Sequence, residues 1–389
     1  MKIKSAEIWV LEHIRKGFSP VILRLTTDDG VQGLGEAALA HGGAPYAGAA
    51  YAGAALLKEM TRHFVLGADP RRTEAMWHTL FRRTYWGQGG GPVIYGAISA
   101  IDTAFWDIKA RALGVPVYEL LGGKVHDTLH VYANGWYDNW ADPARFADAA
   151  RKVVAGGYDA LKFDPFVISG IPWGANMPER LLTRAQINQA VARVSAVRDA
   201  VGPNVEIMLD AHGNLGVGSA IEAGRALEPF RPCFIEEPTD SLNVEAMRKV
   251  SENIRIPVAA GERLYTRYQF REYIEKQILS LVQPDLGLTG GVTEMKKIAA
   301  YADTYGIPFQ PHRYAGPIVT AASTQVSASV PNAAMQEWVV NELPDVLDIV
   351  DDPLERHAAN GQLVVPDKPG IGVNLNAAIV GRYPCTRVE

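Results

Sequence analysis

The chain has 389 residues, 48% of them hydrophobic and 21% charged, and this length exceeds what one hydrophobic core usually supports. Its formal net charge of −5 gives no electrostatic reason to expect nucleic acid or an anionic membrane as a partner. The sequence has only two cysteines, no apolar run of bilayer-spanning length and no signal-peptide core near residue 1, so we expect a cytoplasmic protein without a disulfide framework.

The first part of the chain, residues 1–125, is predicted to be an α+β domain. Alternating apolar residues predict a strand over Ile3–Val10 and another over Pro20–Thr26, and the turn at residues 28–30 leads into a third. Apolar residues at helical spacing follow in three segments, Ala54–Phe64, Arg72–Phe81 and Ala97–Leu113.

From Leu129 onward, short apolar runs alternate with helical segments. Eight strands are predicted: Leu129–Ala133, Ala160–Phe163, Val205–Leu209, Cys233–Ile235, Val258–Ala260, Leu279–Gln283, Pro308–Gln310 and Ala334–Gln336. Helices are expected between them, for example over Pro143–Ala155, Arg184–Ala200, Ser219–Phe230, Glu245–Ile254, Tyr268–Lys276 and Val292–Tyr305. Eight repetitions match a closed parallel (β/α)8-type barrel, over residues 126–340, better than an open sheet. Residues 341–389 are expected to pack back on the first domain.

Three acidic residues end strand-like runs at equal intervals of 26 residues: Asp210, Glu236 and Glu262. One strand, a crossover helix and two short loops need about this many residues, so parallel strands would present the three carboxylates at one end of the barrel. Carboxylates gathered in this way repel one another unless a hard cation lies between them. The sequence therefore predicts a Mg²⁺ site, because isolated helix caps have no reason to keep such a period.

Two histidines and a further aspartate fall in the same register. Asp285 and His312 end the sixth and seventh strands, 27 residues apart, so the carboxylate can orient the imidazole as a general base. His212 follows Asp210 by two residues and is a candidate general acid. The structural alternatives are a hydrogen-bonded pair without chemistry for Asp285 and His312, and a neutral loop histidine for His212.

Glu337 and Lys162 complete the candidate set, at the ends of the eighth and second strands. Glu337 could accept a hydrogen bond from a substrate, or it could pair with a barrel arginine. Lys162 could offer its charge to substrate oxygens across the barrel mouth from the base, or it could pair with Asp164 or another carboxylate. Glu237 is expected to point away from the site.

Several other motifs carry weaker signals. Residues 33–38 imitate a dinucleotide-binding fingerprint but follow a hairpin turn, and Gly89-Gly90-Gly91-Pro92 lacks the residues of a phosphate-binding loop. His41-Gly42-Gly43 is predicted to be either a lid over the substrate or an ordinary loop. The Gly- and Pro-rich insertion Phe166–Leu182 could line the pocket.

Taken together, these residues resemble the enolase superfamily, and within it the mandelate racemase-like sugar-acid dehydratases of the galactonate dehydratase type. The resemblance spans nearly the whole chain, including residues 27–36 and 97–109. It implies that residues 1–125 form a capping domain with lid loops and that the protein forms homo-oligomers. The implied site roles are Mg²⁺ ligands for Asp210, Glu236 and Glu262, general acid for His212, general base for Asp285 with His312, and substrate contact for Glu337.

One departure from the pattern bears on the reaction class. Racemases of this family carry Lys-x-Lys at the second strand, whereas this chain has Lys162-Phe163-Asp164 and lacks the second lysine. Dehydration of an aldonate to a 2-keto-3-deoxy acid needs one base and one acid, and this is the predicted reaction. Cycloisomerisation of an anhydrosugar acid or lactone is the alternative, followed by racemisation or epimerisation and by a regulatory protein without turnover.

Overall fold

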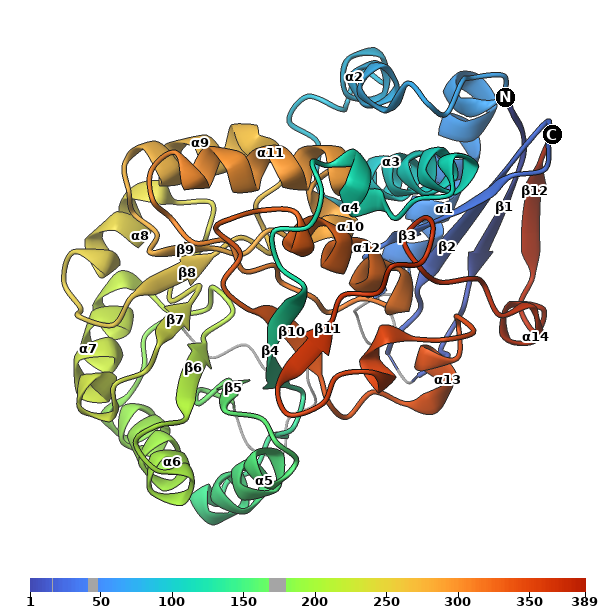
Figure 1. The fold of residues 1–389 in the computed structure, drawn as a ribbon. Coiled ribbons are helices and arrows are strands. Elements are labelled where there is room, and N and C mark those ends of the chain that lie inside the picture. Colours follow the sequence, from blue (N-terminus) through green and yellow to red (C-terminus); the bar gives the residue numbers. More distant parts are fainter. Residues whose placement is uncertain (16, 41–47, 168–179) are drawn as a thin grey trace.

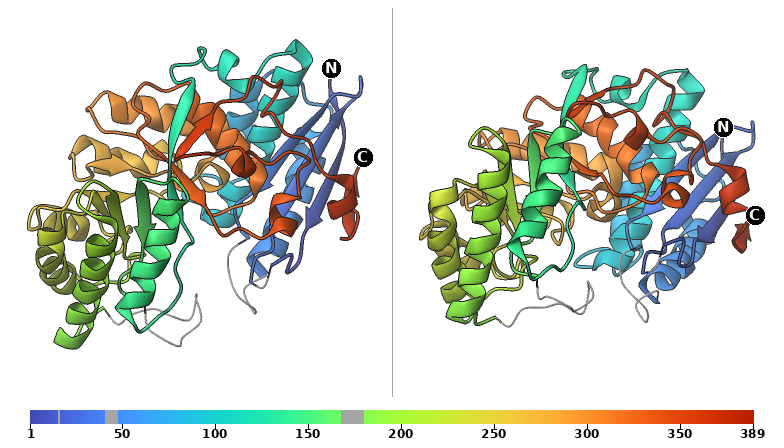
Figure 2. Two further views of the ribbon diagram at one scale, coloured as in Figure 1. Left: turned by 60° about the horizontal axis from the view of Figure 1, so that its bottom comes forward. Right: turned by 90° about the horizontal axis from the view of Figure 1, so that it is seen from below.

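The computed structural model describes residues 1–15, 17–40, 48–167 and 180–389. It consists of an antiparallel sheet with helices beside it and a ring of parallel strands surrounded by helices (Figure 1). These two parts lie side by side in both views of Figure 2. The fold is thus the predicted one, an α/β barrel with an α+β capping domain.

The capping domain begins with the predicted meander. Its elements are β1 (Ile3–Val10), β2 (Val21–Thr27), β3 (Gln32–Ala37), α1 (Gly48–Met60), η1 (Thr61–Val65), α2 (Thr73–Arg83), α3 (Pro92–Leu113) and α4 (Val117–Leu120). Helix α3 is buried on nearly all sides, as its apolar composition requires, and it ends where Gly114 adopts a left-handed φ of 71°. The glycines of the dinucleotide-like motif have a packing role, because a Cβ atom at Gly33 or Gly35 would collide with the backbone of α3.

The barrel strands run in the order β10-β4-β5-β6-β7-β8-β9. They are β4 (Thr128–Asn134), β5 (Ala160–Phe163), β6 (Glu206–Asp210), β7 (Phe234–Glu236), β8 (Val258–Ala260), β9 (Leu281–Val282) and β10 (Gln336–Val339). The predicted seventh strand is reduced to isolated bridges of Phe309 with Val282 in β9 and with Ala333, which precedes β10, and of His312 with Asp285. Pro308 and Pro311 flank this short run and cannot donate ladder hydrogen bonds, which explains its length.

Helices cover the outside of the barrel. They are α5 (Pro143–Ala155), α6 (Arg184–Val201), α7 (Val217–Leu227), η2 (Glu228–Phe230), α8 (Val244–Ser251), α9 (Thr266–Glu275), α10 (Leu286–Thr289), α11 (Gly291–Asp303) and α12 (Pro317–Ala328). Inside the ring, Tyr132, Met208 and Phe234 belong to a small core of their own, separate from the core between strands and helices. The period of two along a strand then places Asp210 and Glu236 on the inner face above Met208 and Phe234.

The last segment contains α13 (Pro344–Leu347), η3 (Leu354–Arg356), β11 (Gln362–Val364), α14 (Ala377–Val380) and β12 (Cys385–Val388). Strand β12 pairs antiparallel with β1 and completes the capping sheet, as expected (Figure 1). Strand β11, which was not predicted, pairs antiparallel with β4. The segment therefore contacts both the capping sheet and the barrel.

Buried side chains of the capping domain hold the first turns of two barrel helices. Asp102 accepts hydrogen bonds from the backbone N–H (2.9 Å) and the hydroxyl (2.6 Å) of Thr293 in α11. Glu36 at the end of β3 accepts backbone hydrogen bonds from Gly316 (2.5 Å) and Val319 (3.2 Å) at the start of α12. Carboxylates are favourable partners for helix N-termini, so these contacts fix the cap over the carboxyl ends of the barrel strands.

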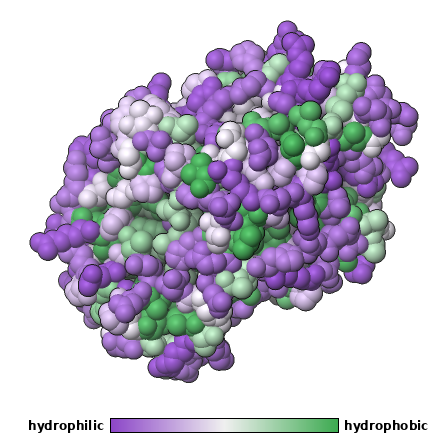
Figure 3. Space-filling view, viewed as in Figure 1, coloured by the Kyte–Doolittle hydropathy of each residue, from purple (hydrophilic) through white to green (hydrophobic). Residues whose placement is uncertain are grey.

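Hydrophilic residues predominate on the face drawn in Figure 3, where hydrophobic ones appear in small separate groups. Among the residues that the structure describes, no helix is both long and apolar enough to cross a bilayer.

Candidate active site

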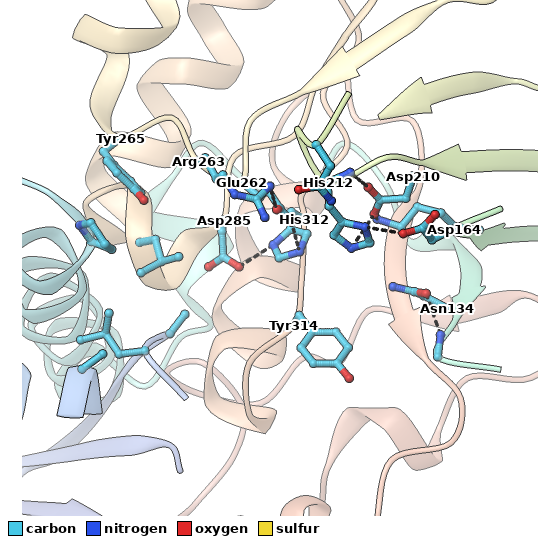
Figure 4. A pocket seen from close by; sticks show the side chains of 18 of the residues that line it. Asn134, Asp164, Asp210, His212, Glu262, Arg263, Tyr265, Asp285, His312 and Tyr314 are labelled. Carbon is cyan, nitrogen blue, oxygen red and sulfur yellow. Dashed lines mark hydrogen bonds and ion pairs between the residues drawn. The ribbon is translucent and has the colours of Figure 1, made fainter. Parts of the chain in front are cut away.

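A cavity of about 500 Å³ lies between the capping domain and the carboxyl ends of the barrel strands. The capping domain supplies mainly apolar lining, including Leu39, Ala49 and Pro92. The barrel supplies the polar lining, namely Asn134, Lys162, Asp164, Asp210, His212, Asn214, Glu262, Arg263, Asp285 and His312. Several of these side chains point toward one another in Figure 4. This end of a (β/α)8-type barrel is where active sites are built.

The three predicted metal ligands occupy neighbouring positions on this end of the barrel. Asp210 and Glu236 are the last residues of β6 and β7 and face each other in the strand register. Glu262 follows β8 by two residues. Gly261 precedes it with a φ of 157°, and a Cβ atom there would collide with the backbone of Gln283. A glycine is therefore needed at position 261, where the chain leaves β8 and passes close to the backbone of Gln283.

Lys162 lies among the carboxylates and is 1% exposed. Its Nζ is 2.6 Å from Glu236, 2.9 Å from Glu337 and 3.3 Å from Asp210. Lys162 thus pairs with carboxylates other than Asp164, which matches the structural alternative predicted for it. These carboxylates hold the pKa of the Lys162 ammonium well above its ordinary value even though burial opposes the charge.

The residue types fit a hard divalent cation. Glu236 Oε1 is buried and has no hydrogen-bond partner among the described residues. Burial and the charge of Asp210 raise the pKa of Glu236 to about 8, although Lys162 lies beside it and acts in the opposite direction. Glu262 is different: although burial opposes ionisation, Arg263 and His312 hold its pKa well below the ordinary value.

The present arrangement is not a finished metal site. The two oxygens of Glu262 are paired separately, Oε1 with Arg263 and Oε2 with His312. Across the described residues, no group of three His, Cys, Asp or Glu side chains is already disposed to hold an ion. Both oxygens of Glu262 would therefore have to share a metal ion with these partners or exchange one of them, and the metal assignment stays a prediction.

The expected contact between Asp285 and His312 is present. Asp285 Oδ2 lies 2.8 Å from His312 Nδ1, and Asp285 Oδ1 accepts the backbone N–H of Gly287 at the start of α10 (Figure 4). The other ring nitrogen of His312 is 2.9 Å from Glu262 Oε2. Burial disfavours the charged ring, but Glu262 and Glu337 outweigh it and keep the pKa of His312 well above its ordinary value.

His212 belongs to a second pair that was not predicted. Its Nδ1 lies 3.0 Å from Asp164 Oδ2, and its Nε2 lies 3.5 Å from Asp210 Oδ2 (Figure 4). Burial opposes the charge on His212, but Asp210 and Asp164 overcome it and raise the pKa of His212 to about 9. The available signal was the spacing: Asp164 follows the inward-facing Lys162 by two residues and so shares its face.

Glu337 lies within β10, fully buried, and is not part of the cavity lining. One of its oxygens accepts hydrogen bonds from Asn134 (2.7 Å) and Lys162 (2.9 Å). The other accepts the backbone N–H of Arg313 (2.7 Å). Glu337 therefore contacts an arginine only through its backbone, because the Arg313 guanidinium pairs with Glu355, and its role stays a prediction.

Other residues fall outside the predicted set or outside the described chain. Glu237 is buried and absent from the cavity lining, as expected, but it contacts Arg263, which lines the cavity, as well as Ser241. The motif His41-Gly42-Gly43 and most of the insertion 166–182 lie outside the described residues. Sequence reasoning missed several polar lining residues: Asn134, Tyr137, Asn214, Arg263, Tyr265 and Tyr314. Asn134 ends β4, so its place at a strand end was the available signal, whereas the loop residues among them have no fixed period that would identify them.

The chain matches two family models. Residues 12–122 match the mandelate racemase/muconate lactonizing enzyme N-terminal domain, and residues 145–379 match the enolase C-terminal domain-like family. Two curated relatives are each 36% identical to the chain. One is D-gluconate dehydratase of Thermoproteus tenax, over 93% of this chain and 69% of the relative. The other is D-galactonate dehydratase of Ralstonia nicotianae, over 92% and 90%.

A solved structure gives the same result. The crystal structure of a member of the enolase superfamily from Salmonella Typhimurium is 35% identical, with a TM-score of 0.92 and coverage of 100% of both chains. Dehydratases of this superfamily typically need a divalent metal ion, which agrees with the carboxylate-rich end of the barrel. On these matches, the chain belongs to the mandelate racemase/muconate lactonizing enzyme family of the enolase superfamily.

Proposed function

We propose that the protein is a hydro-lyase that dehydrates an aldonate to a 2-keto-3-deoxy acid. The observation that carries this proposal is the presence of two imidazoles at one cavity, each held through Nδ1 by an aspartate. A β-elimination needs one group that removes a proton and another that gives one. The dehydratase relatives support the same reaction class.

In the proposed reaction, His312 removes the proton from C2 of the substrate, and Asp285 holds the ring for this step. The electrons form a C2–C3 double bond as the C3–O bond breaks. His212 gives its proton to the departing hydroxyl, which leaves as water. The enol then tautomerises to the 2-keto acid, and the two proton transfers balance.

Asp210, Glu236 and Glu262 are proposed to hold a Mg²⁺ ion. When bound, the ion would neutralise the negative charge that develops on the substrate carboxylate as the proton leaves. Lys162 and Glu337 are proposed to support the intermediate. The contacts of Lys162 with three carboxylates favour a part in which it holds these groups in place. The capping residues Leu39, Ala49 and Pro92 exclude water from one side of the cavity.

The test is a screen of the Mg²⁺-loaded protein against hexonates, pentonates, aldarates and anhydrosugar acids. Keto products are detected with semicarbazide, and every mixture is analysed by mass spectrometry. A keto product lighter by one water, lost in His312→Asn, supports the dehydratase and identifies its substrate. The variant removes the proposed base and keeps the approximate size of the side chain.

Other outcomes contradict the proposal. A keto product of unchanged mass would indicate cycloisomerisation. Deuterium at C2 without a keto product would indicate racemisation or epimerisation, because proton exchange then occurs without elimination. No product and no deuterium across the library would indicate a protein without turnover of sugar acids.

A further inference from the structure

Asp164 is a buried carboxylate with both oxygens engaged. It follows β5 by one residue and is 6% exposed. Its Oδ1 accepts the backbone N–H of Phe166 at 2.6 Å, and its Oδ2 lies 3.0 Å from His212 Nδ1. The backbone contact fixes the plane of the carboxylate, so Oδ2 has a set direction toward the imidazole.

The same arrangement recurs on the other side of the cavity at Asp285. Its Oδ1 also accepts the backbone N–H of the residue two positions later, at 2.8 Å, and its Oδ2 lies 2.8 Å from His312 Nδ1. The proposed acid and the proposed base are therefore held by equivalent carboxylates on different strands. Figure 4 shows the two histidines near each other, with Asp285 and Asp164 on their far sides.

The other ring nitrogens both face members of the proposed metal-ligand set, at different distances. His312 Nε2 lies 2.9 Å from Glu262, and His212 Nε2 lies 3.5 Å from Asp210. Each imidazole thus directs Nδ1 to an aspartate outside the proposed metal-ligand set and Nε2 to a member of that set. A proton can be exchanged with a substrate only through the second nitrogen, because the first is occupied.

An ionised carboxylate only accepts hydrogen bonds, so a carboxylate at Nδ1 keeps the hydrogen on that nitrogen. It also stabilises the doubly protonated ring by its charge. A ring in this state can give up the Nε2 proton and remain in a neutral form that still donates to Asp164. We propose that Asp164 is a positioning residue that makes His212 a proton donor through Nε2 during loss of the C3 hydroxyl, an inference that rests on the proposed dehydration.

The variant Asp164→Asn tests this inference because the structure determines how the amide must lie. The Phe166 N–H needs an acceptor, so the amide oxygen takes the place of Oδ1 and the NH₂ group faces His212. His212 Nδ1 must then accept a hydrogen bond, and the ring carries its only hydrogen on Nε2. A neutral imidazole is a poor acid, so we expect loss of the C3 hydroxyl to slow by about 10²–10⁴-fold.

Two readouts separate this effect from general damage to the site. The first is exchange of the C2 proton in D₂O, which needs His312 but not His212 and is expected to persist in Asp164→Asn. The second is turnover of a 3-deoxy-3-fluoro aldonate, whose fluoride leaves without a proton. We expect the variant to release fluoride at close to the wild-type rate, and His212→Asn to behave in the same way.

Asp285→Asn is the matched control. It makes the equivalent change at the proposed base, so it is expected to lose C2 exchange, fluoride release and dehydration together. The inference is overturned if Asp164→Asn loses all three activities to the same extent, which would indicate a structural role. It is also overturned if the variant dehydrates the hydroxy substrate at the wild-type rate. Failure of the proposed function would appear separately, as a wild-type protein that dehydrates no aldonate.

Discussion

Lys162 and Glu236 form an ion pair inside the barrel, with Nζ 2.6 Å from Oε2 and both side chains at most 1% exposed. The ammonium also contacts Asp210 and Glu337, so one lysine balances part of the charge of three buried carboxylates. Buried charges are retained only when they are paired, because their desolvation is costly. Lys162 thus pairs with two of the three proposed metal ligands, Asp210 and Glu236.

Replacement of Lys162 by Met is expected to lower the free energy of unfolding by about 3–5 kcal/mol in metal-free protein, because it leaves buried carboxylates unpaired. Mg²⁺ should restore more stability to this variant than to the wild type, since the freed carboxylates would bind the ion more strongly. Urea denaturation with EDTA and with Mg²⁺ measures both effects. Lys249→Met, at an exposed lysine, is the control and should change stability by less than about 0.5 kcal/mol. Equal stabilisation by Mg²⁺ in the variant and the wild type would argue against a shared site.

Replacement of Glu262 by Gln is expected to weaken Mg²⁺ binding by at least the 10–100-fold that is typical when a partner around a metal site is lost. The charge that would face the ion is removed while the shape of the side chain is kept. Isothermal titration calorimetry gives the affinity directly. Glu237→Gln is a close control, because Glu237 shares Arg263 but is absent from the cavity lining. A similar loss of affinity in both variants would mean that Glu262 acts only through Arg263.

The stability of the protein is expected to fall with rising pH through Glu36. Burial raises the pKa of Glu36 from its ordinary 4.5 to about 7, despite two backbone hydrogen bonds. A raised folded-state pKa means that the stabilising contribution is complete below about pH 4.5 and is lost as the pH rises through about 7. In Glu36→Gln the difference in melting temperature from the wild type should therefore change across this window. A constant difference between pH 4.5 and 8 would show that Glu36 does not titrate there.

Replacement of Gly35 by Ala is expected to destabilise the capping domain by about 1–3 kcal/mol, because the added methyl group would collide with the backbone of α3 at Ala100. Gly218→Ala is the control. That glycine lies in α7 with open space around its Cβ position, so alanine should be neutral or slightly stabilising. Thermal denaturation of both variants measures the difference. Equal stability would show that α3 can move away from β3 without cost.

Much of the architecture could be predicted because the strand–helix unit of the barrel repeats along the sequence. The equal spacing of Asp210, Glu236 and Glu262 reflects one βα-unit each, and the first two are indeed the last residues of neighbouring strands. The pairing of the seventh strand was overestimated, because a short apolar run between two prolines forms isolated bridges and not a continuous hydrogen-bonded ladder. The strand β11 was missed because three residues with an exposed first and last position carry no clear period.

The contacts between residues of different units were harder to predict. Asp164 and His212 lie 48 positions apart, and nothing in either segment alone indicates that Oδ2 and Nδ1 meet. For Lys162 the sequence left open a contact with substrate or a carboxylate partner, and it could not indicate that Asp210, Glu236 and Glu337 together surround the ammonium at 1% exposure. Which side chains pair in the barrel depends on strand tilt and burial, and these cannot be read from a single sequence.

The pairing of β12 with β1 also affects how the chain folds during its synthesis. Strand β1 is made long before β12 during translation, yet one of its edges is completed only by residues 385–388. Until these residues leave the ribosome, β1 presents unpaired N–H and C=O groups of the kind that recruit other nascent chains. Interruption of synthesis after the barrel would thus release a chain whose capping sheet still has an unpaired edge that can aggregate.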